Sequence, residues 1–196
     1  SPPMLGVLVR KAAAAELAER IRPLVSDMAR PACARPVAAI LCPYSAFGYL
    51  VDPDDRARML AGAHAGLLPG GRLLLDMYVP DEALPEDTEI ADYVRELPAD
   101  GRWAPAVRLA RSKWLAHDPR TGINRIDRHY RFLAADGGLV REVRTTSLQR
   151  PYPPEALRRV LTEAGFEVAL VPDFDPAHPP GSRARATAVV AHRRCD

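Results

Sequence analysis

The chain has 196 residues and a formal net charge of +2, a length that can bury one hydrophobic core and form one domain. So small a charge supplies no global field for nucleic acid or an anionic membrane, and we expect neither as a partner. No apolar run approaches the ~18 residues of a membrane-spanning helix, and no stretch has the pattern of a signal peptide. The three cysteines lack metal-ligand spacing, which favours reduced thiols in a cytoplasmic protein and no metal site.

The first predicted element is an amphipathic helix at the start of the chain. Ser1 is a suitable N-cap, and Pro2 and Pro3 are suited to the first helical turn. The apolar residues that follow are spaced for one side of a helix: Met4, Leu5, Leu8, Val9, Ala12 and Ala15. Residues 21–25 then predict a strand that runs into a turn at Asp27, where an aspartate commonly caps local amide groups.

The next part of the chain has the pattern of a βαβ unit. Residues 38–42 are apolar and too few for a helix, which favours a buried strand that Pro43 ends. Asp52 is a suitable N-cap for a helix that stops in the glycine-containing segment 68–71, and residues 72–77 predict a second strand. Because both strands are apolar on both faces, we expect a parallel sheet that is covered by helices.

A ligand-binding site is predicted where these two strands end. In open sheets of this kind, ligands bind beyond the carboxyl ends of the strands. The first strand is followed by Tyr44 and Ser45, and the second ends at Asp76, Met77 and Tyr78. We expect Tyr44 and Ser45 to face a pocket.

The second half of the chain predicts a connector and an antiparallel sheet. Residues 79–105 lack periodicity, as a lid or binding loop would. The three β-like runs 106–115, 123–133 and 139–148 are separated by turns, which predicts a meander. Beyond them, residues 155–164 predict a helix that ends at Gly165, and two last strands follow, antiparallel to each other: 167–171 and 186–191.

The middle run of the meander contains a candidate catalytic residue. Strand alternation places Arg125, Asp127, His129 and Arg131 on one face. Histidine titrates near neutral pH, so His129 is a candidate general base. The alternatives are a solvated strand-face histidine, or a face of arginine and histidine that holds an anionic substrate.

The order of these elements resembles a known family. Residues 40–45 (Ile-Leu-Cys-Pro-Tyr-Ser), a capped helix and residues 68–76 (Leu-Pro-Gly-Gly-Arg-Leu-Leu-Leu-Asp) resemble the second half of a class I S-adenosylmethionine-dependent methyltransferase. Bacterial small-molecule and sugar N-methyltransferases are the most similar. The resemblance implies an α/β fold, a partial doubly wound Rossmann-like sheet with an antiparallel β insertion. It also implies three regions: a Rossmann-like core (1–78), a connector and insertion for a lid or dimerisation (79–150), and the last helix and two strands (151–196).

The resemblance further implies a cofactor and a set of site residues. S-adenosylmethionine would be contacted by Asp27, which accepts a hydrogen bond from the adenine amino group, and by Met28, Cys42 and Pro43. A small-molecule substrate, methylated on nitrogen or oxygen in secondary metabolism, would be contacted by Ser45, Tyr78, Arg131 and Tyr152, although Tyr152 is equally suited to a structural corner. His129 or Tyr44 would accept a proton if the nucleophile arrives protonated.

The sequence also departs from that family. The glycine-rich loop and the acidic residue of the preceding strands are not found in the 196 residues. One interpretation is a truncated methyltransferase. Others are a shortened, non-methylating descendant such as a cyclase, or a non-catalytic binding or dimer-partner protein. A shortened sheet would have an exposed edge, which predicts a homodimer.

Overall fold

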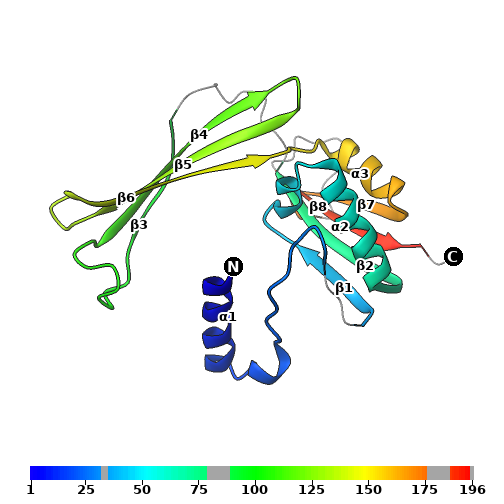
Figure 1. Cartoon of the computed structure of the whole chain (residues 1–196), viewed down its shortest axis with the longest axis horizontal. Helices are drawn as coiled ribbons and strands as arrows, with labels where there is room; N and C mark the ends of the chain where they lie inside the picture. Colours follow the sequence, from blue (N-terminus) through cyan, green and yellow to red (C-terminus); the bar gives the residue numbers. More distant parts are fainter. Residues whose placement is uncertain (32–34, 79–88, 176–185, 195–196) are drawn as a thin grey trace.

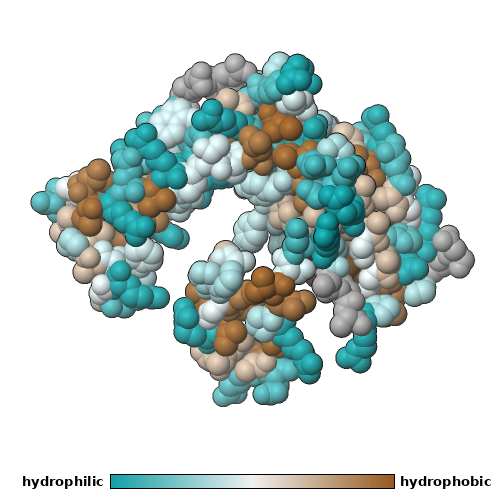
Figure 2. Space-filling model, in the orientation of Figure 1, coloured by the Kyte–Doolittle hydropathy of each residue, from teal (hydrophilic) through white to brown (hydrophobic). Residues whose placement is uncertain are grey.

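The computed structural model describes residues 1–31, 35–78, 89–175 and 186–194, and it contains two four-stranded sheets. The core sheet has the strand order β1 (Val37–Cys42), β2 (Leu67–Tyr78), β8 (Ala186–Arg193), β7 (Phe166–Pro172). The insertion sheet has the order β3 (Ile90–Glu96), β4 (Arg108–Asp118), β5 (Ile123–Leu133), β6 (Leu139–Gln149). Figures 1 and 2 show the two sheets on either side of a hollow, with the first helix in a separate lobe.

The core sheet confirms the predicted βαβ unit. Strands β1 and β2 are parallel, with Cys42 opposite Leu75, and α2 (Pro53–Gly66) connects them. Asp52 is the N-cap of α2 and accepts a hydrogen bond of 2.7 Å from the Asp54 N–H. Strand β2 begins earlier than predicted because Leu67 already pairs with Val37, ahead of an irregularity in the register. Helix α2 therefore passes directly into the strand.

The last two strands are antiparallel to each other, as predicted, and this fixes which strand ends meet. Strand β8 runs antiparallel to β2, and β7 antiparallel to β8. Strand β7 is therefore parallel to β1 and β2, so the carboxyl ends of all three strands lie at one edge of the core sheet.

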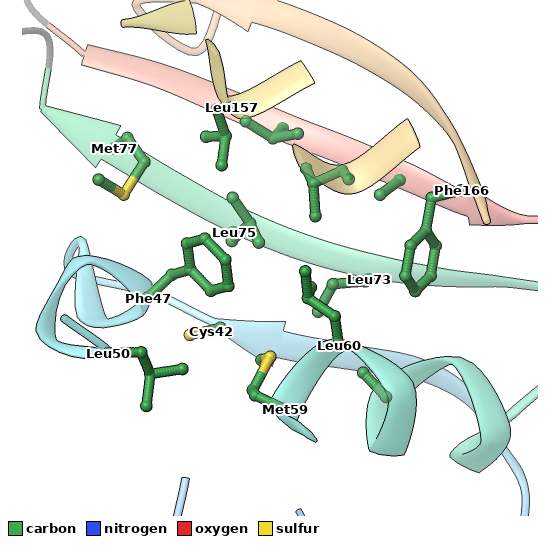
Figure 3. Packing of buried hydrophobic residues seen from close by; sticks show 14 of the residues in the cluster. Cys42, Phe47, Leu50, Met59, Leu60, Leu73, Leu75, Met77, Leu157 and Phe166 are labelled. Atoms are coloured by element: carbon green, nitrogen blue, oxygen red, sulfur yellow. The ribbon is translucent and has the colours of Figure 1, made fainter. Parts of the chain in front are cut away.

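One face of the core sheet carries the hydrophobic core. Helices α2 and α3 (Pro154–Glu163) pack on this face, where Leu60, Leu73, Leu157 and Phe166 are fully or almost fully buried (Figure 3). Burying a side chain of this size stabilises the fold by about 1.5–3 kcal/mol. The two helices and four strands are therefore held together mainly by this cluster.

The opposite face of the core sheet is uncovered among the described residues. Leu41 of β1 is 68% exposed. Helix α1 (Pro2–Ala14) does not cover it, and its Met4 is 72% exposed in the lobe that stands apart in Figure 2. At the end of α1, the carbonyl of Ala12 accepts a hydrogen bond from the Leu17 N–H, next to the short 3₁₀ helix η1 (Ala18–Arg20).

The strand expected at residues 21–25 is not formed. The segment has no regular secondary structure and pairs with neither described sheet. A strand needs a neighbour to receive its backbone hydrogen bonds, and local sequence preference does not supply one. Along the described ranges, no helix is long and apolar enough to cross a bilayer.

The insertion sheet confirms the predicted meander. All neighbouring strands are antiparallel, and β5 has the predicted bounds. The connector expected at residues 79–105 contains the strand β3, and its first part, residues 79–88, lies outside the described residues. The end of β6 adjoins the turn η2 (Ala46–Tyr49), where Arg150 donates a backbone hydrogen bond of 2.8 Å to the Gly48 carbonyl.

Candidate functional site

The ends of β1 and β2 meet in a hydrogen-bonded group that we call the strand-tip cluster: Tyr44, Ser45, Asp76 and Tyr78. The Asp76 carboxylate accepts hydrogen bonds from the backbone N–H of Tyr44 at 2.7 Å and of Ser45 at 3.1 Å. The Ser45 hydroxyl accepts a third bond, of 3.0 Å, from the Tyr78 N–H. The structure therefore brings together three predicted site residues, Tyr44, Ser45 and Tyr78, at the edge where the fold is expected to bind ligands.

The backbone of this cluster is strained. Tyr44 has a φ of 62° and Ser45 a φ of 52°, both in the left-handed region. That conformation costs a non-glycine residue about 1–2 kcal/mol, whereas a hydrogen bond to a charged group contributes about 1.5–3 kcal/mol. The two bonds to Asp76 are therefore of the size needed to offset the strain at both residues.

The side chains of the cluster differ in exposure. Ser45 is 2% exposed, whereas Tyr44 is 89% and Tyr78 is 71% exposed. The Ser45 carbonyl also accepts a hydrogen bond of 3.3 Å from the Gln149 side chain at the end of β6. The cluster thus exposes the rings of Tyr44 and Tyr78 on either side of the buried Ser45, which also contacts the insertion sheet.

A second candidate site is a groove of about 570 Å³ on the insertion sheet. We call it the sheet groove, and its residues include Glu89, Trp114, Arg125, Asp127, His129, Arg131 and Arg144. His129 Nε2 lies 3.0 Å from Glu142 Oε2, and the His129 ring stacks on Trp114 with centroids 6.2 Å apart. The side chain of His129 is only 12% exposed, so its orientation is fixed by these two neighbours.

Most arginines of the sheet groove are paired with carboxylates, and Arg128, which also lines it, is bonded to Tyr49 and Ser147. The arginines Arg125, Arg131 and Arg144 each lie within 4 Å of a carboxylate, on Asp127, Glu89 and Glu142 respectively. The hydrogen bond with His129, followed by that with Arg144, lowers the pKa of Glu142. These three arginines are therefore already paired, which argues against the interpretation of this face as an anion site.

The two candidate bases do not lie together. His129 is five residues along β5 from Asn124, which pairs with Gln149 next to Ser45. At about 3.4 Å per residue, His129 is about 17 Å from that end of the strand. Tyr44 therefore belongs to the strand-tip cluster, and His129 and Arg131 to the sheet groove.

Of the remaining predicted residues, Cys42 and Tyr152 lie in the core. Cys42 is 6% exposed, and burial, followed by the nearby Asp76 carboxylate, raises the pKa of its thiol. Tyr152 is 5% exposed and packs against Phe47 with ring centroids 5.6 Å apart, as its structural-corner interpretation requires. A ligand at the strand tips would meet Cys42 mainly through its backbone.

Asp27, Met28 and Pro43 lie in loops. Asp27 Oδ1 accepts a hydrogen bond of 3.0 Å from the Ala29 N–H, as in the predicted turn, and its side chain is exposed. Met28 is partly buried against the core, and Pro43 is exposed beside Tyr44.

Sequence reasoning missed the roles of Asp76, Glu142 and Gln149. A single carboxylate after three leucines at the end of a predicted strand was a usable signal for Asp76, because an acidic group is costly there without partners. Glu142 and Gln149 gave no such signal, since their contacts depend on strand register and on the placement of the two sheets.

No family profile and no curated protein matches the sequence. Among solved structures, an S-adenosylmethionine-dependent methyltransferase from Clostridium acetobutylicum ATCC 824 is similar with a TM-score of 0.76 and 13% identity, over 100% of this chain and 73% of that protein. The CcbJ methyltransferase from Streptomyces caelestis has a TM-score of 0.74 and 20% identity, over 99% and 72%.

A third similar structure is the sugar N-methyltransferase KedS8 from Streptoalloteichus sp ATCC 53650. Its TM-score is 0.62 at 20% identity, and the match covers 92% of this chain and 67% of that protein. At these identities the likeness establishes architecture. The chain therefore has the Rossmann-like fold of the S-adenosylmethionine-dependent methyltransferases, with an antiparallel β insertion.

Proposed function

We propose that this chain is part of an S-adenosylmethionine-dependent methyltransferase that methylates a nitrogen or oxygen of a small metabolite. The observation that carries the proposal is the strand-tip cluster, which holds Tyr44 and Tyr78 exposed at the carboxyl ends of two parallel strands. The similar structures support it, because they include a sugar N-methyltransferase and a glycopeptide N-methyltransferase. Another similar structure, CalS10, is an amino pentose methyltransferase involved in calicheamicin biosynthesis, which favours a role in secondary metabolism.

The residues present fit part of a cofactor site. Pro43 and the Tyr44 ring offer exposed surface at the strand ends, and the exposed Asp27 carboxylate has Oδ2 available to accept a hydrogen bond from an adenine amino group. Cys42 and Met28 would contribute backbone and packing contacts. S-adenosylmethionine, when bound, supplies a methyl group on a sulfonium centre, from which it is transferred by in-line displacement.

The protein's own contribution to this reaction is position and proton transfer. Because a displacement at a methyl group needs alignment above all, residues that hold the acceptor in line carry most of the catalysis. An amine that arrives protonated must lose a proton before it attacks, and Tyr44 or His129 would accept it. Tyr78 and Arg131 are the proposed substrate contacts, whereas the other two predicted contacts, Ser45 and Tyr152, have buried side chains.

The chemistry of the sheet groove favours an acceptor without phosphate. Three of its arginines are paired with carboxylates, and the fourth, Arg128, is bonded to Tyr49 and Ser147, so each already has a partner within the chain. We favour N-methylation of an amine, by likeness to the sugar N-methyltransferase KedS8, with Tyr44 as the proton acceptor, because His129 lies about 17 Å along β5 from the strand tips.

A homodimer is the second part of the proposal. The uncovered face of the core sheet and the edge strand β1 leave apolar and backbone groups exposed, and edge strands tend to pair with another chain. The same features would serve a non-catalytic dimer-partner protein or a shortened, non-methylating enzyme.

Calorimetric titration tests the enzymatic proposal. We expect S-adenosylmethionine and S-adenosylhomocysteine to bind with micromolar affinity, and amine acceptors to become methylated when the protein and S-adenosylmethionine are mixed. If neither ligand binds at millimolar concentration, the proposal of methyl transfer is wrong and the non-methylating alternatives are favoured.

A further inference from the structure

Tyr44 combines two properties that the fold of the described residues does not require. Its backbone is in the left-handed region, with a φ of 62°, and its side chain is 89% exposed. Glycine adopts this conformation without a steric penalty. A tyrosine at this position adds strain, and with so little of the ring buried it gains little packing in return.

The strain is held in place from a distant part of the chain. Asp76 accepts the N–H groups of both Tyr44 and Ser45 with its two carboxylate oxygens, at 2.7 and 3.1 Å. Ser45 is further fixed by the Tyr78 N–H on its hydroxyl and by Gln149 on its carbonyl. Strain that the surroundings maintain in this way is typical of functional sites.

We propose that Asp76 is a positioning residue for methyl transfer, which holds Tyr44 and Ser45 in the left-handed conformation so that the Tyr44 ring contacts the ligand at the strand tips. The inference rests on the proposed function and deepens it: Asp76 itself touches no ligand, and it acts through Tyr44. The fold keeps a strained tyrosine there because the ring is needed at the site.

The test distinguishes the effect of Asp76 on the backbone of Tyr44 from the contact of the Tyr44 ring with the ligand. Three variants are compared with the wild type: Asp76→Asn, Tyr44→Gly and the double variant. Asp76→Asn keeps the shape of the side chain but replaces one carboxylate oxygen with an amide group that cannot accept a hydrogen bond. We expect it to lower the unfolding temperature and to weaken the binding of S-adenosylhomocysteine at least tenfold in calorimetry.

The glycine variants should separate stability from affinity. Tyr44→Gly removes strain and should raise the unfolding temperature by about 2 °C, while it also weakens binding at least tenfold. In the double variant, glycine tolerates the left-handed backbone without Asp76. Its unfolding temperature should therefore recover at least half of the decrease that Asp76→Asn causes alone. The affinity of the double variant for S-adenosylhomocysteine should stay low, because the Tyr44 ring is absent.

Glu16→Gly is the matched control, because Glu16 is another exposed residue with a positive φ, of 57°, at the end of α1. It should gain stability without a change in affinity. A double variant that binds S-adenosylhomocysteine within twofold of the wild type would overturn the inference, as would unchanged affinity in Tyr44→Gly. Absence of binding to the wild-type protein would instead overturn the proposed function, and the ligand role of Tyr44 with it.

Discussion

Gln149 Nε2 lies 3.3 Å from the carbonyl oxygen of Ser45, although the two residues are 104 positions apart in the chain. This contact joins the end of β6 to the strand-tip cluster. Nearby, Arg128 of β5 donates a hydrogen bond of 3.1 Å to the Tyr49 hydroxyl in η2. The insertion sheet is therefore attached to the core sheet at the edge where the ligand is proposed to bind.

Arg128→Ala should loosen this attachment. The change removes the hydrogen bonds of Arg128 to Tyr49 and to Ser147, each worth about 1 kcal/mol. We expect faster hydrogen exchange in residues 46–49 and a small loss of stability. Arg141→Ala is the control, because Arg141 lies on the same face of the sheet, near its far end, and contacts Phe132. Equal exchange at 46–49 in both variants would show that Arg128 does not link the sheets.

Glu142 should make stability depend on pH in the acid range. Its pKa is lowered in the folded state, chiefly by His129 and then by Arg144. The contribution of Glu142 to stability is therefore fully present above its unfolded pKa of about 4.3, and it is lost as the pH falls through the lower folded value. Thermal unfolding between pH 6 and pH 3 measures this dependence, which should be weaker in Glu142→Gln. Glu163→Gln, on the exposed end of α3, should match the wild type.

The two faces of the core sheet should respond differently to truncation. Leu161 is fully buried between α3 and the sheet, so Leu161→Ala should reduce the free energy of unfolding by about 2–5 kcal/mol. Leu41 is 68% exposed on the opposite face, and Leu41→Ala should change the free energy of unfolding by about 0.5 kcal/mol or less. Denaturant titration compares the two. A large cost at Leu41 would mean that another segment or chain covers that face.

The proposed homodimer predicts a particle of about twice the 21.5 kDa chain mass in light scattering. Pairing through the edge strand β1 is the expected mode, since it gives partners to backbone groups that the core sheet leaves unpaired. Dilution should dissociate such a dimer in a concentration-dependent way. A well-folded monomer at all concentrations would contradict the proposal.

Local signals in the sequence predicted the elements that position the strand-tip cluster. The cap at Asp52, the stop at Pro43 and the apolar run before Asp76 are local features, and they fixed the βαβ unit whose ends bring Tyr44 and Tyr78 together. Alternation along β5 likewise predicted that Arg125, Asp127 and His129 share a face, because a strand's side chains alternate wherever it lies.

Features that depend on distant partners were not predictable in the same way. Residues 21–25 have strand-like character but no neighbouring strand, and Cys42 lies at a strand end yet points into the core. The separation of His129 from Tyr44 follows from where the insertion sheet attaches, which no local pattern encodes. The bonds of Asp76 to Tyr44 and Ser45 bridge more than 30 positions in the chain.

The most direct test of the account is hydrogen exchange with and without S-adenosylhomocysteine, followed peptide by peptide. Ligand binding at the carboxyl ends of β1 and β2 should protect the segment 43–50 and the end of β2 near Tyr78, while α3, on the covered face of the core sheet, remains unchanged. Protection confined to other segments, or none at saturating ligand, would contradict a methyltransferase site at the strand tips.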